Sequence, residues 1–175
     1  AGKISKSIVS LINAAGGKAV SIGGKDGHVF IARRIKTAKN DLGLVGKIEQ
    51  VNPTVIESLD RSGFIPVISS IAAGDEDESL NINADEAASA LAVALKAMKL
   101  IYLTDVEGIK DEQGQLVARM SLSDTQRLIR KKVISGGMIP KAHCCMEAVA
   151  KGVGSAHIID GRIMHSGLLE LFTDT

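Results

Sequence analysis

The sequence has almost no aromatic residues: tryptophan is absent, and one tyrosine and three phenylalanines make up 2% of 175 residues. Proteins that bind single-stranded nucleic acid stack the bases on aromatic rings, so this composition argues against such a surface. The net charge of +1 indicates neither a nucleic-acid footprint nor a basic membrane patch. We therefore expect neither a nucleic acid nor a membrane as a partner.

Long apolar runs and spaced cysteines are also missing. No stretch of about 18 apolar residues exists, and the first ten residues lack the apolar core of a signal peptide. The two cysteines, Cys144 and Cys145, are adjacent, and after His143 they are better interpreted as thiols on a helix than as metal ligands. We expect no metal site in the chain, and a reducing cytoplasm, or an organelle stroma if a transit peptide was lost.

Two common nucleotide-binding signatures are absent as well. None of the Gly-Lys pairs is followed by Ser or Thr in a GxxxxGK[ST] frame, which excludes a Walker-type loop. Gly152-Val153-Gly154 begins like a dinucleotide fingerprint, but the third glycine does not follow at the required spacing. A nucleotide site in this chain must therefore be built in another way.

The hydrophobic pattern predicts helices alternating with strands along a single domain, residues 1–175. Alternation of this kind indicates an α/β fold with a mainly parallel sheet and helices on both faces. Gly23 to Gly27 is predicted to close an antiparallel hairpin, and residues 73–80 are predicted to form an acidic loop. We expect helices at 5–15, 53–63, 83–97, 123–132, 138–151 and from about 166, and strands at 18–22, 28–34, 44–51, 64–69, 100–104 and 156–160.

Two of these elements carry specific burial predictions. The first helix is expected to bury the face that holds Ile8, Leu11, Ile12 and Ala15. The strand at 64–69 is apolar enough to be covered on both faces.

Polar segments follow several of the predicted strands. Ligands of open α/β sheets bind beyond the C-terminal ends of the strands, which singles out the segments after Ser69, Thr104 and Ile134. In Thr104-Asp105-Val106-Glu107-Gly108-Ile109, the polar pair at the strand end suits a nucleotide's sugar or base. A loop whose turns are stabilised by Asp is the alternative, and the pattern does not decide between them.

Asn81-Ile82-Asn83-Ala84-Asp85 stands at a loop-to-helix junction. Asn and Asp favour helix N-caps, so capping alone is one explanation. One cap needs one such residue, however, and three are present. Ligand binding by the amides and the carboxylate therefore remains equally open.

Ser135-Gly136-Gly137-Met138-Ile139-Pro140-Lys141 is the most informative segment. Its glycines allow the backbone to approach a ligand closely, and Pro140 marks the first turn of a helix. Lys141 then lies at the positive end of a helix dipole, a conflict of about 0.3–1 kcal/mol that a bound anion would remove. The alternative is an exposed lysine that tolerates this cost.

Four segments together resemble the amino-acid kinase family in their order and spacing. The likeness covers essentially the whole chain and implies a three-layer αβα sandwich with a mainly parallel sheet. The Asn-x-Asn-Ala-Asp element favours the members that phosphorylate N-acetyl-L-glutamate over the uridylate, carbamate, aspartate and glutamate 5-kinases. The segments are Pro66–Ile71, Asn81–Asp85, Leu103–Ile109 and Gly136–Lys141.

The resemblance implies roles for individual residues. Lys141 would be catalytic by stabilising the transferring phosphoryl group, and Asp85 by orienting that lysine. Asn81 and Asn83 would bind N-acetyl-L-glutamate, and the cofactor would be ATP with Mg²⁺. The residues that would hold ATP are Thr104, Asp105, Val106, Gly108, Ile109, Val133, Ile134, Ser135, Gly137 and Met138.

The implied chemistry is consistent with these residue types. A carboxylate nucleophile, with an ordinary pKa of about 4, is already deprotonated at neutral pH and needs no general base. The obstacle is charge repulsion, so positioning and cations are expected to carry catalysis. The product would be an acyl phosphate, as in arginine biosynthesis.

The resemblance also suggests that part of the active site is missing. Family members begin with a strand and a Lys-x-Gly-Gly loop, followed by a second glycine cluster and an arginine for the substrate. Gly16-Gly17-Lys18 does not match that loop. The sequence is therefore expected to be an N-terminally incomplete enzyme, inactive on its own.

The last segment, His165 to Phe172, resembles the one that marks arginine-inhibited members, although Gly167 replaces the usual leucine. His165 and Glu170 are candidate contacts for an arginine effector, with an ordinary amphipathic helix as the alternative. The resemblance further implies a homo-oligomer and leaves open a signalling-protein partner. Two other functions stay open: a non-catalytic nucleotide- or arginine-binding regulatory domain of the same fold, and a related kinase for an aminoadipate-type substrate.

Overall fold

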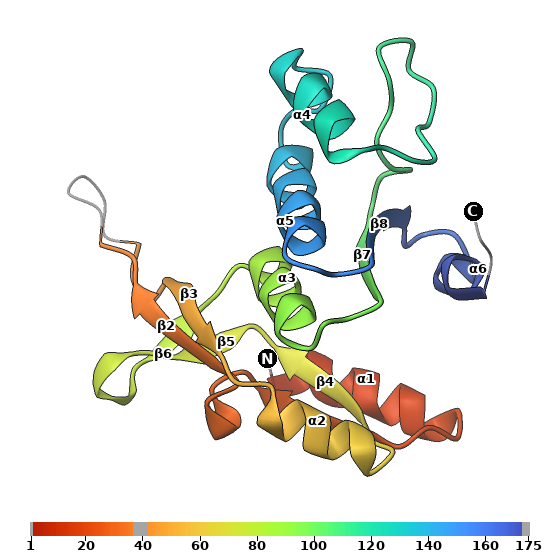
Figure 1. Ribbon diagram of the computed structural model, residues 1–175. Coiled ribbons are helices and arrows are strands. Elements are labelled where there is room, and N and C mark those ends of the chain that lie inside the picture. The colour runs from red at the N-terminus through yellow and green to blue at the C-terminus, as the bar shows by residue number, and fades with distance from the viewer. Residues whose placement is uncertain (1, 37–41, 173–175) are drawn as a thin grey trace. The chain divides into compact units, whose positions relative to one another are not determined.

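The computed structural model describes residues 2–36 and 42–172, with Asp77 described by its backbone alone (Figure 1). The chain divides into two compact units, Ala1–Leu95 and Lys96–Thr175, and each is described by itself. Among the described residues, no helix is both long and apolar enough to cross a membrane.

The N-terminal unit holds two groups of strands. Strands β1 and β4 pair in parallel, whereas the second sheet has the order β3-β2-β5-β6 and mixes parallel and antiparallel neighbours. Helix α1 packs against β1 and β4, α2 packs against β4, and α3 packs against β3. The elements are α1 (Gly2–Ala14), β1 (Ala19–Gly23), η1 (Asp26–His28), β2 (Phe30–Arg34), β3 (Gly46–Val51), α2 (Thr54–Arg61), β4 (Ile65–Ser69), β5 (Ile71–Ala73), η2 (Asp75–Asp77), β6 (Ser79–Asn81) and α3 (Ala84–Ala94).

A continuous hydrophobic core supports this unit. Val29, Phe30, Leu80 and Ile82 are almost completely removed from solvent. The small residues of α3 let that helix lie close to the sheet, and Ala87 joins the core directly. Burying several large side chains in this way supplies most of the driving force for folding.

The hairpin predicted between residues 18 and 34 is wrong. The glycine cluster does make a turn, but β1 goes on to pair with β4, and Gly24 N–H donates to Ser69 O at 3.0 Å. Phe30 then opens β2, which pairs with β3 and β5. A Cβ on Gly24 would collide with the ring of Phe30, so the close packing of this turn requires glycine.

Two burial predictions for the N-terminal unit are also wrong. Ile8, Leu11 and Ala15 are exposed, and of the predicted face only Ile12 is half-buried; the inward side of α1 runs through Ser5, Val9 and Ile12. Two adjacent apolar stripes share this helix, and periodicity could not tell which one meets β1 and β4. Phe64 and Ile65 are exposed and the rest of β4 is only half-buried, so the strand at 64–69 is not covered on both faces either.

The segment predicted as an acidic loop contains a small antiparallel hairpin. Ile71, Ala72 and Ala73 of β5 pair with Asn81, Leu80 and Ser79 of β6. Strands of three residues are too short to show a clear period-2 pattern, and the acidic turn between them dominates the composition.

The C-terminal unit is built on one parallel pair of strands, which confirms the parallel element predicted here. Its elements are β7 (Lys99–Thr104), α4 (Leu122–Arg130), α5 (Met138–Ala150), β8 (Ser155–Asp160) and α6 (Ser166–Phe172). Helix α5 packs against β7, β8 and α4, and α6 packs against β8. Leu128, Ile134 and Ala142 form a small core.

The register of β7 and β8 determines where the polar loops emerge. Thr104 pairs with Asp160, so both strands end at the same edge of this sheet. The loops that follow, from Asp105 and from Gly161, therefore begin side by side. This is the edge at which ligands bind in open α/β sheets.

Candidate active site

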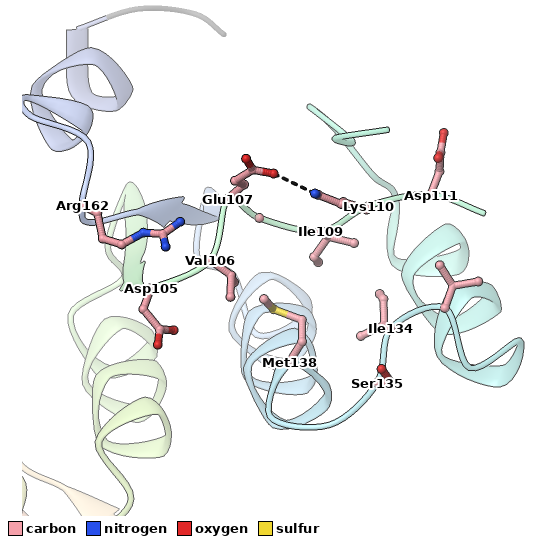
Figure 2. Close-up of a pocket in the computed structure, with 12 residues that line it drawn as sticks. Asp105, Val106, Glu107, Ile109, Lys110, Asp111, Ile134, Ser135, Met138 and Arg162 are labelled. Carbon is pink, nitrogen blue, oxygen red and sulfur yellow. Dashed lines mark ion pairs between the residues drawn. The ribbon is translucent and has the colours of Figure 1, made fainter. Parts of the chain in front are cut away.

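A pocket of about 560 Å³ lies in the C-terminal unit, beyond the ends of β7 and β8. It is lined by three segments that are distant in sequence: the loop after β7, the approach to α5, and the turn after β8 (Figure 2). The lining residues are Asp105, Val106, Glu107, Gly108, Ile109, Lys110, Asp111, Val133, Ile134, Ser135, Met138 and Arg162.

The first wall is a loop that folds back on itself. Gly108 has a φ of +138°, and Lys110 and Leu116 form an isolated antiparallel bridge. The carboxylate of Asp111 accepts backbone N–H bonds from Gln113 and Gln115 at 2.9 and 2.8 Å, which closes the turn. An Asp-stabilised turn thus exists in this loop and shapes the pocket, but Asp111 makes it, outside the segment from Thr104 to Ile109 for which the sequence allowed one.

The second wall runs from the end of α4 to the start of α5. Ile134 is buried in the core of this unit, and its N–H donates to Leu128 O at 3.3 Å. Ser135, Gly136 and Gly137 are exposed and lead into the N-terminus of α5, with Gly136 at a φ of +56°. The first backbone N–H groups of a helix have no partner within the helix, so this end of the pocket favours negative charge.

Two ion pairs shape the electrostatics of the pocket. Glu107 Oε2 lies 2.7 Å from Lys110 Nζ, and this lysine lowers the pKa of Glu107 (Figure 2). Asp160 is buried and receives hydrogen bonds from Arg162, which lower the pKa of Asp160 to about 2. The pKa of Arg162 is raised, mainly by Asp160 and further by Asp105 and Glu107.

Lys141 lies in the first turn of α5 and is half-buried. Its Nζ is 5.5 Å from the ring centroid of Tyr102, a buried residue of β7, at a distance typical of a cation–π contact. The lysine stem thus lies along its own unit rather than extending into solvent. Lys141 is not among the residues that line the pocket.

The residues of the polar segment Asn81–Asp85, in the N-terminal unit, have different roles. Asn83 caps α3, because its side-chain oxygen accepts the N–H groups of Asp85 and Glu86 at 2.9 and 3.2 Å. Asn81 ends β6 with an exposed side chain, and its backbone N–H donates to Leu44 O at 2.7 Å. The capping alternative therefore accounts for Asn83 but gives no role to the side chains of Asn81 and Asp85.

Most of the residues predicted to hold ATP lie together. Eight of the ten line the pocket, and Thr104 and Gly137 adjoin lining residues without lining it themselves. Sequence reasoning missed Lys110, Asp111 and Arg162 as lining residues and gave Glu107 no role of its own within the segment from Thr104 to Ile109. The only sequence signal for Arg162 was its place after a predicted strand.

A second pocket in the same unit, of about 670 Å³, includes Glu170 but not His165. Glu170 Oε1 lies 2.6 Å from Nδ1 of His157, and Lys99 Nζ donates to Glu170 O at 2.7 Å. His165 is exposed in the turn before α6 with a φ of +63°. The structure thus brings Glu170 together with a different histidine from the one that the sequence pointed to.

Parallel strands that end on a pocket define an α/β protein of the class that binds ligands at the C-terminal edge of its sheet. The model of the family described as "Amino acid kinase family" matches residues 1–160, and the chain belongs to that family. The α/β amino-acid kinase fold predicted from the sequence is thereby confirmed.

Individual relatives agree with the family match. An acetylglutamate kinase from Syntrophus aciditrophicus is 50% identical over 183 residues, which cover 99% of this chain and 62% of that enzyme. The structure of smu.665 from Streptococcus mutans has a TM-score of 0.77 and 35% identity, over 89% of this chain and 62% of that one. An N-acetylglutamate synthase from Neisseria gonorrhoeae, complexed with coenzyme A and L-arginine, has a TM-score of 0.77 and 25% identity, over 90% and 36%. The chain thus spans about 62% of the length of the first relative it matches.

Proposed function

We propose that this chain belongs to an ATP-dependent kinase that phosphorylates the side-chain carboxylate of N-acetyl-L-glutamate, an acyl-phosphate-forming step of arginine biosynthesis in the cytoplasm. The observation that carries the proposal is the 50% identity to an acetylglutamate kinase along 99% of the chain. The pocket at the end of β7 and β8 supports it, because it offers a nucleotide a defined place.

In the proposed complex, ATP occupies the pocket of about 560 Å³. Val106 and Ile109, in the loop after β7, provide apolar surface for the base, and Ile134 and Met138 line the pocket nearer the start of α5. Thr104 and Asp105, at the end of β7, suit the sugar. The backbone N–H groups of the segment from Ser135 to Gly137 and the N-terminus of α5 attract the phosphates.

Charge stabilisation is the proposed route of catalysis. Lys141 meets the charge that develops on the transferring phosphoryl group, and Asp85 orients this lysine. Asn81 binds N-acetyl-L-glutamate, and the donor groups of the Asn83 amide remain free for the same task while its oxygen caps α3. Mg²⁺ is proposed to travel on the nucleotide phosphates, as is common where few protein ligands are offered. Among the described residues, no cluster of three His, Cys, Asp or Glu side chains is arranged to hold a metal.

Feedback by arginine is a second proposal, attached to the pocket of about 670 Å³. Glu170 supplies the acidic group that a guanidinium needs, and it was a candidate on sequence grounds. The synthase from Neisseria gonorrhoeae that was solved with L-arginine supports the idea through its likeness. The homo-oligomer and the signalling-protein partner stay predictions from the family resemblance.

The test uses the protein expressed from its complete gene, with ATP, Mg²⁺ and hydroxylamine to trap an acyl phosphate. We expect hydroxamate to form with N-acetyl-L-glutamate, at about 1–100 turnovers per second as is typical of kinases. A strong preference for the N-acetyl derivative of aminoadipate would favour the related kinase instead. Nucleotide or arginine binding without any turnover would favour a regulatory domain.

A further inference from the structure

We propose that Arg162 is a nucleotide-recognition residue whose guanidinium plane stacks against the base of ATP in the pocket beyond β7 and β8. This inference rests on the proposed nucleotide site. The site was suggested by the loop after β7 and the approach to α5, and Arg162 lies outside both segments. It assigns the turn after β8 to base recognition and predicts a preference for ATP over UTP.

The first argument is that the guanidinium is fixed in place. Its Nε donates to Asp160 Oδ1 at 2.9 Å, and its Nη2 donates to Asp160 Oδ2 at 2.7 Å. The backbone N–H of Arg162 also donates to Asp160 Oδ1, at 2.9 Å. A two-pronged contact of this kind holds the plane of the group while its faces stay accessible, and the side chain is 62% exposed.

The second argument concerns the charge of Arg162. Its nearest partner is the buried carboxylate of Asp160, and Asp105 and Glu107 act on it as well. Because Asp160 pairs with the guanidinium and the negative charges of Asp105 and Glu107 also act on it, this wall does not favour the triphosphate of a nucleotide. A flat, neutral base is a better partner for the exposed face of the guanidinium.

The third argument is the position of Arg162 in the pocket. Figure 2 shows Arg162 on the side of Asp105, whereas Ser135 lies across the pocket at the approach to α5. If the phosphates meet the N-terminus of α5, the base points toward the opposite wall. The ends of β7 and β8, and with them Arg162, form that wall.

The fourth argument is the composition of the pocket. None of the described residues that line it is aromatic, so a base finds no ring to stack on. Arginine planes stack on nucleic-acid bases as aromatic rings do. Among the described residues that line the pocket, only Arg162 has a planar cation, and it can take the role that an aromatic ring has elsewhere.

The experiment measures binding by calorimetry to the protein expressed from its complete gene, with MgATP, MgUTP and magnesium triphosphate as ligands. The variants are Arg162→Ala, Arg162→Lys and the control Arg127→Ala. Arg127 is also exposed and paired with an aspartate, Asp124, at 2.9 Å, but it does not line the pocket. Thermal unfolding of each variant shows whether it is folded.

We expect Arg162→Ala to weaken ATP binding about 10-fold, as the loss of one good planar contact does, and to leave triphosphate binding unchanged. The preference for ATP over UTP should shrink, because a purine offers more stacking surface than a pyrimidine. Arg162→Lys should behave like Arg162→Ala, since it keeps the charge without the plane, and Arg127→Ala should match the wild type.

Three outcomes would overturn the inference. Equal weakening of ATP and triphosphate would assign Arg162 to the phosphates, and full affinity in Arg162→Lys would make charge the relevant property. Unchanged ATP binding in Arg162→Ala would leave Arg162 only the structural role of holding the turn after β8 through Asp160. Absence of ATP binding in the wild type would instead contradict the proposed function, so the two failures can be told apart.

Discussion

The two units of the chain use the same types of polar residue for different ends. In the N-terminal unit, side chains close local backbone structure: Asn83 caps α3, Asp26 Oδ2 accepts Gly23 N–H at 2.8 Å, and Asn13 Oδ1 accepts Ala19 N–H at 2.6 Å. In the C-terminal unit, Glu107 pairs with Lys110 and Arg162 pairs with Asp160, and both ion pairs lie at an open pocket. Residue type alone therefore does not identify a site, because Asp111 in the pocket also closes a backbone turn. What distinguishes the pocket is that charged side chains pair with one another beside an open space.

The largest difference between the two units is expected in their contribution to the stability of the protein, which we expect to depend on the core of the N-terminal unit. Leu80 is completely buried among Val29, Phe30 and Ile82, so Leu80→Ala should lower the free energy of unfolding by about 2–5 kcal/mol. Urea unfolding of the protein, followed by circular dichroism, measures this loss.

The matched control is Leu11→Ala, because Leu11 lies on α1 with 72% of its surface exposed. A substitution of an exposed residue usually changes stability by no more than about 0.5 kcal/mol. If Leu11→Ala costs as much as Leu80→Ala, the apolar stripe of α1 is buried in the protein in solution, and the difference between the two leucines disappears.

For catalysis, the largest effect is expected in the other unit, at Lys141. Loss of one donor to transition-state charge typically lowers kcat by about 100- to 1000-fold, so Lys141→Ala should do so while stability hardly changes. The KM for N-acetyl-L-glutamate should move much less, since the lost contact belongs to the transition state. Lys141→Arg should restore only part of the rate, because a planar fork places its charge differently from an ammonium.

Steady-state kinetics and thermal unfolding of these two variants decide the matter. A Lys141→Ala enzyme with a near-normal kcat would remove Lys141 from the mechanism. It would leave the contact with Tyr102 as the main role of this lysine.

Sequence reasoning predicted the bounds of an element well where the hydrophobic periodicity and the caps of that element define it. The helices around Asn83 and Met138 and the strand from Lys99 to Thr104 appear close to their predicted bounds, since long periodic segments and caps are local properties. Eight of the ten residues that the family resemblance implies for ATP line one pocket. The end of β7 and the start of α5 were also singled out by local signals, independently of the resemblance.

The remaining features depend on partners that are distant in sequence. The strand partner of β1 is β4 rather than β2, and no local pattern of residues 18–34 carries that choice. Arg162 reaches the pocket because β8 pairs with β7 in one register, with Thr104 opposite Asp160. Which of two apolar stripes on α1 is buried likewise depends on the strands it meets.

A smaller effect tests the division of roles between Asn81 and Asn83. Asn83→Ala removes the cap of α3 and should lower the free energy of unfolding by about 1 kcal/mol. Asn81→Ala should leave stability within about 0.5 kcal/mol but raise the KM for N-acetyl-L-glutamate, if the exposed amide binds substrate. Urea unfolding and steady-state kinetics of both variants measure the two effects, and a stability loss in Asn81→Ala with an unchanged KM would reverse the assignment.

The smallest effect is expected at the turn after β8, and it appears only in acid. The pKa of Asp160 is lowered from its ordinary value of 3.8 to about 2 by the hydrogen bonds from Arg162. Between these values the unfolded chain binds more protons than the folded one, so stability falls as the pH falls. The contribution of this pair is therefore complete above about pH 4 and is lost as the pH drops through about 2.

Arg162→Ala should consequently be less stable than the wild type at pH 5, and the difference should vanish near pH 2, as melting temperatures measured across this range would record. Arg127→Ala is the control, because the lowered pKa of Asp124 is caused first by the hydroxyl of Ser121, and Arg127 adds less. Its stability difference from the wild type should change little with pH. If both variants lose stability in parallel across the range, the fixed geometry of the Arg162 guanidinium does not depend on Asp160, and the contrast between the pocket wall and an ordinary exposed ion pair fails.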